Sequence, residues 1–284
     1  MSGIVTATAL LSSTLPTPVP GFAPLWFRNE IIGAIGRHWL PRLPPDLFKV
    51  ADEGTPPAPA VRVRGVDRRG EPGLIPLDTL NRWLAEWAER LHQDGLLPGW
   101  RGERVHLYGA AETEPLLTVE RGLLRPLGLL LRSVQVNVFT LEKSQLRIWV
   151  ARRADSKAVD PGCYDTLVGG GIAGDETPLE TLVRECQEEA GIGRALARRA
   201  VPIGVIDSTA QVVDGAVTVL HRERLMLYDL KVPVSFQPAL VDGESQSARY
   251  LSPDAVVQSI KVNPWTREGA WATTDLIRRQ LQKG

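Results

Sequence analysis

The chain has little cysteine and no excess charge of either sign. Its 284 residues include only two cysteines, Cys163 and Cys186, too few for a disulfide framework, so we expect a reducing, cytoplasmic setting. Lysine plus arginine and aspartate plus glutamate number 33 each, which gives no bulk electrostatic attraction to nucleic acid or anionic membranes. No apolar run reaches the roughly 20 residues of a membrane span. Residues 1–20 lack a basic start, so we expect a flexible or edge segment rather than a signal peptide.

Histidine is also scarce. The four histidines are scattered and show no metal-ligand spacing, so we assign none of them a catalytic role: His38, His92, His106 and His221. Hydrophobic residues make up 43% and charged residues 23%, as in ordinary globular domains. The length fits one large or two modest domains.

The pattern of the chain predicts a division near residue 127. We expect an N-terminal extension over 1–20, a smaller α+β domain of unclear role over 21–126, and a second domain over 127–284. Alternation predicts strands over 61–66 and 104–108. An apolar stripe at helical spacing predicts a helix over 78–92, with tryptophans that pack in the core rather than stack on a ligand: Leu80, Trp83, Leu84, Trp87 and Leu91.

In the second domain, alternation predicts a hairpin of strands 134–141 and 146–152. Further strands are expected over 203–206 and 222–230, with a turn at 213–215. A short helix should open at Ser252-Pro253, and the segment 265–282 should form a closing helix.

Residues 170–192 read GGIAGDETPLETLVRECQEEAGI and form the most informative motif of the chain. Thr177-Pro178-Leu179-Glu180 is a capping box with proline at the first helical position, and Gly191 suits the left-handed residue that ends a helix. Five residues recur at helical spacing and predict an inward apolar face: Leu179, Leu182, Val183, Cys186 and Ala190.

Three carboxylates gather on another face of this helix. Glu185, Glu188 and Glu189 stand at i, i+3 and i+4, with Arg184 one turn before Glu188. A solvated acidic face is the plain alternative. Because Gly169, Gly170 and Gly171 precede the helix and allow close backbone approach to a phosphate or metal, we favour a site for Mg²⁺, which takes a few carboxylates plus phosphate oxygens.

The spacing G-x5-E-x7-R-E-U-x-E-E-x-G-U, in which U is an apolar residue, is matched at each fixed position, so the chain resembles the Nudix hydrolase superfamily. Segments outside the motif resemble the branch related to the Nudix part of thiamine pyrophosphokinase fusions, whose members carry an extra N-terminal domain. They are Trp149–Arg153, Lys157, Pro161-Gly162, Asp165–Gly169, Asp242–Glu244, Tyr250 and Trp265–Leu281.

The resemblance implies an α/β/α sandwich with a mixed sheet, in addition to the smaller N-terminal domain. It implies Mg²⁺ or Mn²⁺ held by Glu185, Glu188, Glu189 and a carbonyl of Gly169, with Gly170 an alternative carbonyl ligand. Glu176 and Gly170 would lie next to these ligands without binding the ion directly, and for Glu176 the alternative is that it binds a second metal ion. Arg184 would orient the glutamates. The base is left open between Glu185, Glu188 and a downstream glutamate, for which we favour Glu244, itself also an ordinary loop acid on the plain interpretation.

The basic residues nearest the motif are Arg152, Arg153 and Lys157, which are either ligands of the substrate's phosphates or members of a solvated loop. The expected partner is a small-molecule diphosphate, with no nucleic acid, no membrane and a homodimer left open.

The branch implies hydrolysis of damaged (oxo or oxy) thiamine diphosphate to the monophosphate. The alternatives are a Nudix hydrolase of ADP-ribose, dinucleotides or oxidised nucleotides, an isopentenyl diphosphate isomerase of the same fold, and a non-catalytic ligand-binding regulator. The intact motif argues against the isomerase, and the presence of all the glutamates argues against the regulator.

Overall fold

A computed structural model describes residues 19–50, 60–64, 75–97, 99–109, 114–157, 159–214, 217–241 and 243–282. The expected N-terminal extension lies outside these ranges except for its last two residues, as do Gly215 and Asp242. No helix in the described part of the chain is long and apolar enough to cross a membrane.

The chain divides into two compact units. The first unit takes Met1–Leu131, Ala173–Asp175 and Asp207–Arg224, and the second takes Arg132–Ile172, Glu176–Ile206 and Leu225–Gly284. The boundary near residue 131 falls at the start of a long strand. The alternation of apolar and polar residues within 207–224 does not predict that this segment groups with the first unit.

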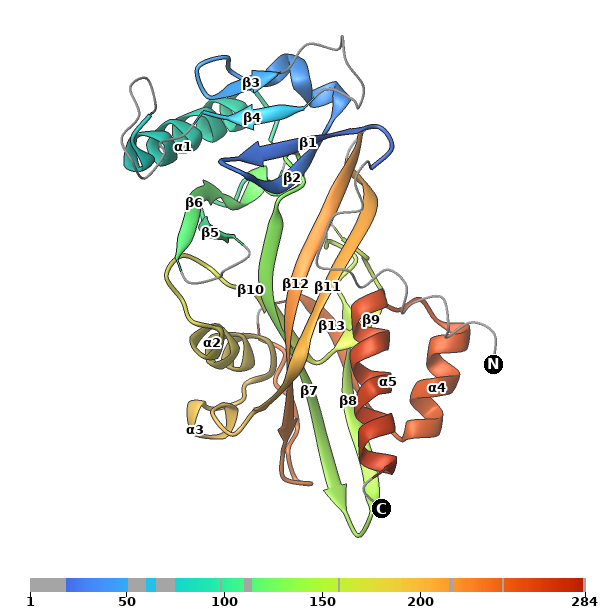
Figure 1. The fold of residues 1–284 in the computed structure, drawn as a ribbon. Coiled ribbons are helices and arrows are strands. Elements are labelled where there is room, and N and C mark those ends of the chain that lie inside the picture. Colours follow the sequence, from blue (N-terminus) through green and yellow to red (C-terminus); the bar gives the residue numbers. More distant parts are fainter. Residues whose placement is uncertain are drawn as a thin grey trace. The chain divides into compact units, whose positions relative to one another are not determined.

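The first unit contains a four-stranded sheet, a two-stranded hairpin and one long helix (Figure 1). The sheet has the order β2-β1-β4-β3, and β5 pairs with β6. Its elements are β1 (Phe22–Phe27), β2 (Glu30–Gly36), η2 (Arg37–Arg42), β3 (Phe48–Val50), β4 (Val61–Val63), α1 (Leu77–Gln93), β5 (Arg104–Tyr108), β6 (Pro115–Glu120) and η3 (Arg121–Leu123).

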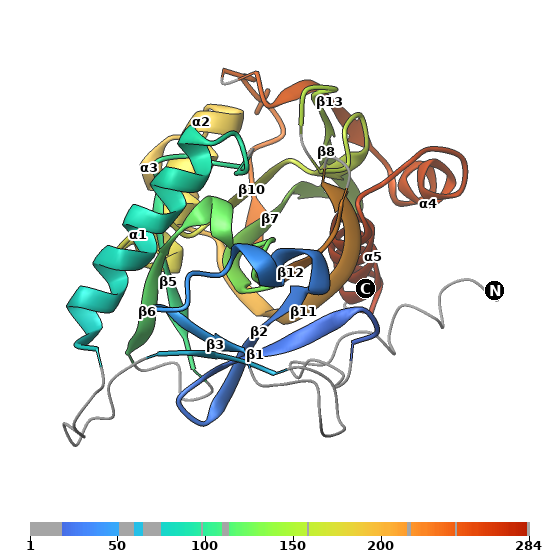
Figure 2. The same cartoon turned by 90° about the horizontal axis from the view of Figure 1, so that it is seen from above.

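The helix and strands predicted in this unit are present, although Arg64 of the predicted strand 61–66 is described and lies outside β4. Strand β4 ends at Val63, and residues 65–66 of the predicted strand lie outside the described ranges. Helix α1 buries Leu80, Leu84 and Leu91 with Trp87, while Trp83 is partly buried against the same core, so both tryptophans pack as predicted. Figure 2 shows α1 alongside β6.

The second unit is built on a seven-stranded sheet of order β11-β12-β7-β8-β13, with β10 paired to β7 and β9 paired to β8. Residues 207–214 of β11 and 217–224 of β12 belong to the first unit. Its elements are β7 (Leu130–Glu142), β8 (Gln145–Arg153), β9 (Tyr164–Thr166), β10 (Val168–Gly171), α2 (Pro178–Ala190), α3 (Arg194–Ala197), β11 (Val201–Asp214), β12 (Val217–Lys231), β13 (Ser245–Leu251), α4 (Pro253–Val262) and α5 (Arg267–Leu281). The β7–β8 hairpin turns at Lys143 and Ser144, both with positive φ, as a two-residue hairpin requires.

Alternate residues of β7 serve two separate cores, which makes this unit a sandwich. Val134, Val136 and Val138 pack with α2, whereas Phe139 packs with α4 and α5. Figure 2 accordingly places α2 on one side of the sheet and α5 on the other. The predicted fold class, a helix-covered sheet with further α+β structure, is confirmed.

Three details of the sequence interpretation are wrong. Leu179 is 42% exposed because it lies in the first turn of α2, where Thr181 is buried instead. The strands expected at 203–206 and 222–230 are much longer, so Val213 and Asp214 belong to β11 rather than to a turn. Trp265 precedes α5, because Thr266 caps this helix and Trp265 instead forms a bridge with Tyr164.

Candidate functional site

Helix α2 begins and ends as its sequence predicts. The Thr177 hydroxyl accepts from the Glu180 amide at 3.3 Å, and the Glu180 carboxylate accepts from the Thr177 amide at 2.9 Å. This capping box lowers the pKa of Glu180, chiefly because the Thr177 amide stabilises its charged form. At the other end Gly191 adopts φ 64°, and a β-carbon there would lie 2.9 Å from Cβ of Ala239. The helix is therefore fixed at both termini.

The apolar side of α2 anchors it to the sheet. Leu182, Cys186 and Ala190 are fully buried among the valines of β7. Burial raises the pKa of the Cys186 thiol to about 12, so this cysteine is a neutral core residue. Both cysteines are free thiols, as predicted.

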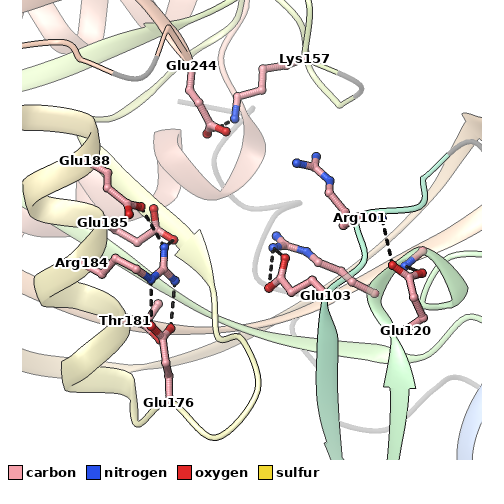
Figure 3. A network of polar contacts seen from close by, with 12 residues as sticks. Arg101, Glu103, Glu120, Lys157, Glu176, Thr181, Arg184, Glu185, Glu188 and Glu244 are labelled. Atoms are coloured by element: carbon pink, nitrogen blue, oxygen red, sulfur yellow. Dashed lines mark hydrogen bonds and ion pairs between the residues drawn. The ribbon is translucent and has the colours of Figure 1, made fainter. Parts of the chain in front are cut away.

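On the other side of α2, one guanidinium joins three carboxylates (Figure 3). Arg184 donates to both oxygens of Glu176 at 2.9 Å from Nε and Nη2. Its Nη1 donates to Glu185 at 2.8 Å and to Glu188 at 3.0 Å. The hydroxyl of Thr181 also donates to Glu176, at 2.8 Å. Arg184 thus fixes the relative positions of the glutamates.

The carboxylate of Glu185 lies directly against the backbone of β10. A β-carbon on Gly170 would come within 1.9 Å of Glu185 Oε1, so only glycine permits this approach. Only 12% of the Glu185 side chain is exposed. Burial, opposed by Arg184 and reinforced by the negative charges of Glu188 and Glu244, raises the pKa of Glu185 to about 7.

Glu189 faces inward rather than outward. The residue is 8% exposed, and its Oε2 accepts from the backbone amide of Gly169 at 2.7 Å. This bond ties the C-terminal half of α2 to β10. The three glutamates that share a helical face in sequence therefore lie in different surroundings, with Glu188 the most exposed at 50% of its side chain.

Glu244 lies in the same unit, paired with Lys157 (Figure 3). Its carbonyl accepts from the amide of Ala154 at 2.8 Å, and the Lys157 amide in turn donates to the carbonyl of Ala154 at 3.1 Å. Of the groups that shift the pKa of Glu185, Glu244 contributes least to raising it, through its negative charge.

Arg152 and Arg153 make contacts within their own loop. Arg152 Nε donates to the carbonyl of Gly162 at 3.1 Å, and Arg153 Nη2 donates to that of Val159 at 3.0 Å. Arg153 also pairs with Asp165 at 3.5 Å. Both guanidiniums therefore shape the loop that follows β8.

Sequence reasoning missed two contributors to this region. The Thr181 hydroxyl donates to Glu176. Thr181 stands about one helical turn before Arg184, and this spacing could have predicted that both side chains reach the same carboxylate. Asp165 accepts from Gln135 at 2.8 Å and from the amide of Thr166, and burial raises its pKa to about 6. Nothing in the local sequence distinguishes Asp165 from an ordinary strand acid.

Among the described residues, no three His, Cys, Asp or Glu side chains are gathered closely enough to hold a metal ion. The donor set nevertheless fits Mg²⁺, which in proteins needs only one or two carboxylates and completes its shell with water and phosphate oxygens. The space beside Gly170 that a Cβ would fill is occupied by the Glu185 carboxylate, which agrees with this donor set.

Comparison with known proteins gives relatives along most of the chain. The chain is 30% identical over 241 residues to "Nudix hydrolase 20, chloroplastic" of Arabidopsis thaliana, covering 84% of this chain and 62% of that protein. It is 33% identical over 179 residues to "Nudix hydrolase 24, chloroplastic" of the same plant, covering 63% of this chain and 48% of that protein. The chain therefore spans about half to three fifths of the length of these relatives.

A solved structure, that of DR0079 from Deinococcus radiodurans, is 20% identical and aligns with a TM-score of 0.43, covering 62% of this chain and 98% of that chain. The family described as "NUDIX domain" matches residues 131–270, which include the whole of the 170–192 motif. Residues 131–270 are therefore similar to Nudix domains, and the two plant relatives are named as Nudix hydrolases.

Proposed function

We propose that this protein is a pyrophosphohydrolase that cleaves the diphosphate linkage of a small molecule. The observation that carries the proposal is the bridge from Arg184 to three glutamates, beside the room that Gly170 leaves for Glu185. A helix face that served only solubility would not require one guanidinium to hold three carboxylates against a glycine strand.

Glu185, Glu188 and Glu189, with the carbonyl of Gly169, would hold Mg²⁺ or Mn²⁺. The bond from the Gly169 amide to Oε2 of Glu189 holds this carboxylate beside the strand whose carbonyl would be the backbone ligand. When bound, such a cation supplies charge neutralisation for phosphate oxygens and a more acidic water.

The other roles, which are proton transfer, orientation of the carboxylates and phosphate binding, fall to side chains of the protein. Glu185, Glu188 and Glu244 are the candidate bases, of which one would accept the proton of the attacking water. Arg184, assisted by Glu176, orients the carboxylates. Lys157, Arg152 and Arg153 are the candidate phosphate ligands. Lys157 is paired with Glu244, so a bound diphosphate would compete for it.

For the substrate we propose damaged (oxo or oxy) thiamine diphosphate, on the resemblance of the flanking segments. Water attacks one phosphorus, the P–O–P bond breaks, and the products are the thiamine monophosphate analogue and inorganic phosphate. ADP-ribose, dinucleotides and oxidised nucleotides carry the same linkage and remain the alternatives. A cytoplasmic location stays a prediction, and the two plant relatives are named chloroplastic.

The test is turnover of a diphosphate panel by the purified full chain in Mg²⁺. The panel holds thiamine diphosphate, its oxo and oxy forms, ADP-ribose, NADH and oxidised dGTP, with phosphate and monophosphate products measured. We expect preference for the damaged thiamine forms. Preference for a nucleotide would keep the hydrolase and overturn the thiamine assignment, whereas binding without turnover would favour the regulator.

Variants of α2 test the site itself. Glu185→Gln and Glu188→Gln should each lower kcat, by about 100-fold or more where the residue is the base. Glu180→Gln is the matched control, because glutamine also completes a capping box and the change removes a charge from the same helix. Wild-type turnover by both Glu185→Gln and Glu188→Gln in saturating Mg²⁺ would show that the site is wrong.

A further inference from the structure

The side chain of His106 makes two polar contacts, one with the neighbouring strand and one with a loop residue of the 170–192 motif. It lies on β5 opposite Thr118 of β6, and its Nδ1 is 2.9 Å from the Thr118 hydroxyl. Its Nε2 is 2.7 Å from Oδ1 of Asp175, a residue that groups with the first unit. Since a carboxylate only accepts, Nε2 carries the hydrogen, and in the neutral ring Nδ1 then accepts from Thr118.

Thr118, the hydrogen-bond partner of the imidazole, is itself bonded to helix α1. The amide of Thr118 donates to the side chain of Asn81, on α1, at 3.0 Å. The His106 side chain is only 17% exposed, whereas that of Asp175 is fully exposed. The ring is therefore a buried donor, and the exposed carboxylate of Asp175 is bonded to it.

A second bond joins the same strand to the same loop. The amide of Gly174 donates to the carbonyl of Arg104 at 2.8 Å, two residues before His106 on β5. Gly174 has φ 45°, a conformation that suits glycine. Two consecutive loop residues are thus bonded to one strand, one through its backbone and one through its side chain.

The next residue in the chain is Glu176, which accepts both bonds from Arg184 and one from Thr181. Arg184 in turn donates to Glu185 and Glu188. The position of residues 174–175 therefore limits where the Glu176 carboxylate lies, and through Arg184 it limits where the other two carboxylates lie.

We propose that β5 sets the arrangement of the acidic cluster on α2, and that His106 is a positioning residue for cation binding there. The proposal rests on the proposed function, because it takes Glu185 and Glu188 as the cation ligands. It gives the first unit a role in preparing the site that requires no contact between this unit and a substrate.

The test is direct binding of Mn²⁺ to the full chain, followed by electron paramagnetic resonance, which needs no substrate. His106→Leu and Asp175→Ala should each raise the Mn²⁺ dissociation constant about threefold to tenfold, a modest change because Asp175 is exposed. The double variant His106→Leu/Asp175→Ala should bind Mn²⁺ no less tightly than the single variant with the lower affinity, because both substitutions remove the same contact. His106→Gln, which keeps a donor near Nε2, should recover most of the affinity.

His92→Leu is the matched control, because His92 stacks on Trp100 within the same unit and has no bond to the motif among those that the structure gives. It should leave the dissociation constant unchanged. Asp175→Ala keeps the proposal testable even where His106→Leu reduces folding, because an exposed side chain is lost without a cavity.

Two outcomes separate this proposal from the proposed function. If Mn²⁺ binding is unaffected by the double variant Glu185→Gln/Glu188→Gln, the cation site is wrong, and with it the ground for both proposals. If Glu185→Gln/Glu188→Gln abolishes Mn²⁺ binding while His106→Leu and Asp175→Ala bind as wild type, the cation site is supported and the positioning role of His106 is overturned. Additive losses from His106→Leu and Asp175→Ala would likewise overturn it.

Discussion

Replacing Gly170 with alanine places a methyl group where the Glu185 carboxylate now lies. The new Cβ would be 1.9 Å from Oε1 and 2.1 Å from Cδ of Glu185, whereas ordinary contact begins at 3.4 Å. The carboxylate must therefore retreat by about 1.5 Å, the difference between 3.4 and 1.9 Å. That displacement breaks its 2.8 Å bond with Arg184.

The effect on activity should far exceed the effect on stability. A misplacement of about 1 Å in a catalytic arrangement costs about 100-fold in rate, so we expect kcat to fall by about 100-fold or more. The obstructing atoms belong to the end of a flexible side chain rather than to backbone, so the free energy of unfolding should fall by only about 1–3 kcal/mol.

The assay is the initial rate of phosphate release from the best substrate of the panel in saturating Mg²⁺, beside urea unfolding. Gly169→Ala is the adjacent control, because its Cβ would lie 3.4 Å from the Val134 carbonyl oxygen, in ordinary contact, and its amide bond to Glu189 is kept. It should retain at least about tenfold more activity than Gly170→Ala. If Gly170→Ala turned over within about threefold of wild type, the argument that this approach matters would fail.

Three further predictions concern stability. Gly128→Ala should cost more than about 3 kcal/mol, because its Cβ would lie 2.2 Å from the Ala34 carbonyl oxygen, whereas Gly95→Ala, also at positive φ but in open space, should cost only about 1–2 kcal/mol in urea unfolding. Asp165, whose pKa rises to about 6, should destabilise the protein as pH increases from about 4 through 6, and Asp165→Asn should flatten that dependence in metal-free urea titrations; an unchanged slope would contradict the burial argument. Thr177→Ala should lower stability by about 1 kcal/mol through loss of the capping box, and no change in thermal unfolding would count against it.

The local features of the site could be predicted because each depends on neighbouring residues. The capping box at Thr177 and Glu180, the left-handed Gly191 and the pairing of Arg184 with Glu188 all involve short separations in sequence. The β7–β8 hairpin was predictable for the same reason, since alternation fixes its register.

The rest depends on distant parts of the chain. The inward orientation of Glu189 on α2 involves a bond to Gly169 on strand β10, whereas helical periodicity alone groups Glu189 with Glu188. The contact of His106 with Asp175 joins residues 69 apart, and the burial of Asp165 depends on Gln135 and Arg153. No pattern within a single element contains this information.

The bridge at Arg184 has a kinetic consequence. When Glu176, Glu185 and Glu188 are all ionised, the cluster carries three negative charges against one positive charge, a formal charge of minus two. A free diphosphate approaching this cluster is repelled, whereas a diphosphate already complexed with a divalent cation is not. The order of arrival therefore matters above pH 7. We expect the cation to bind first or to enter with the substrate, so that excess uncomplexed diphosphate slows the reaction by sequestering the cation.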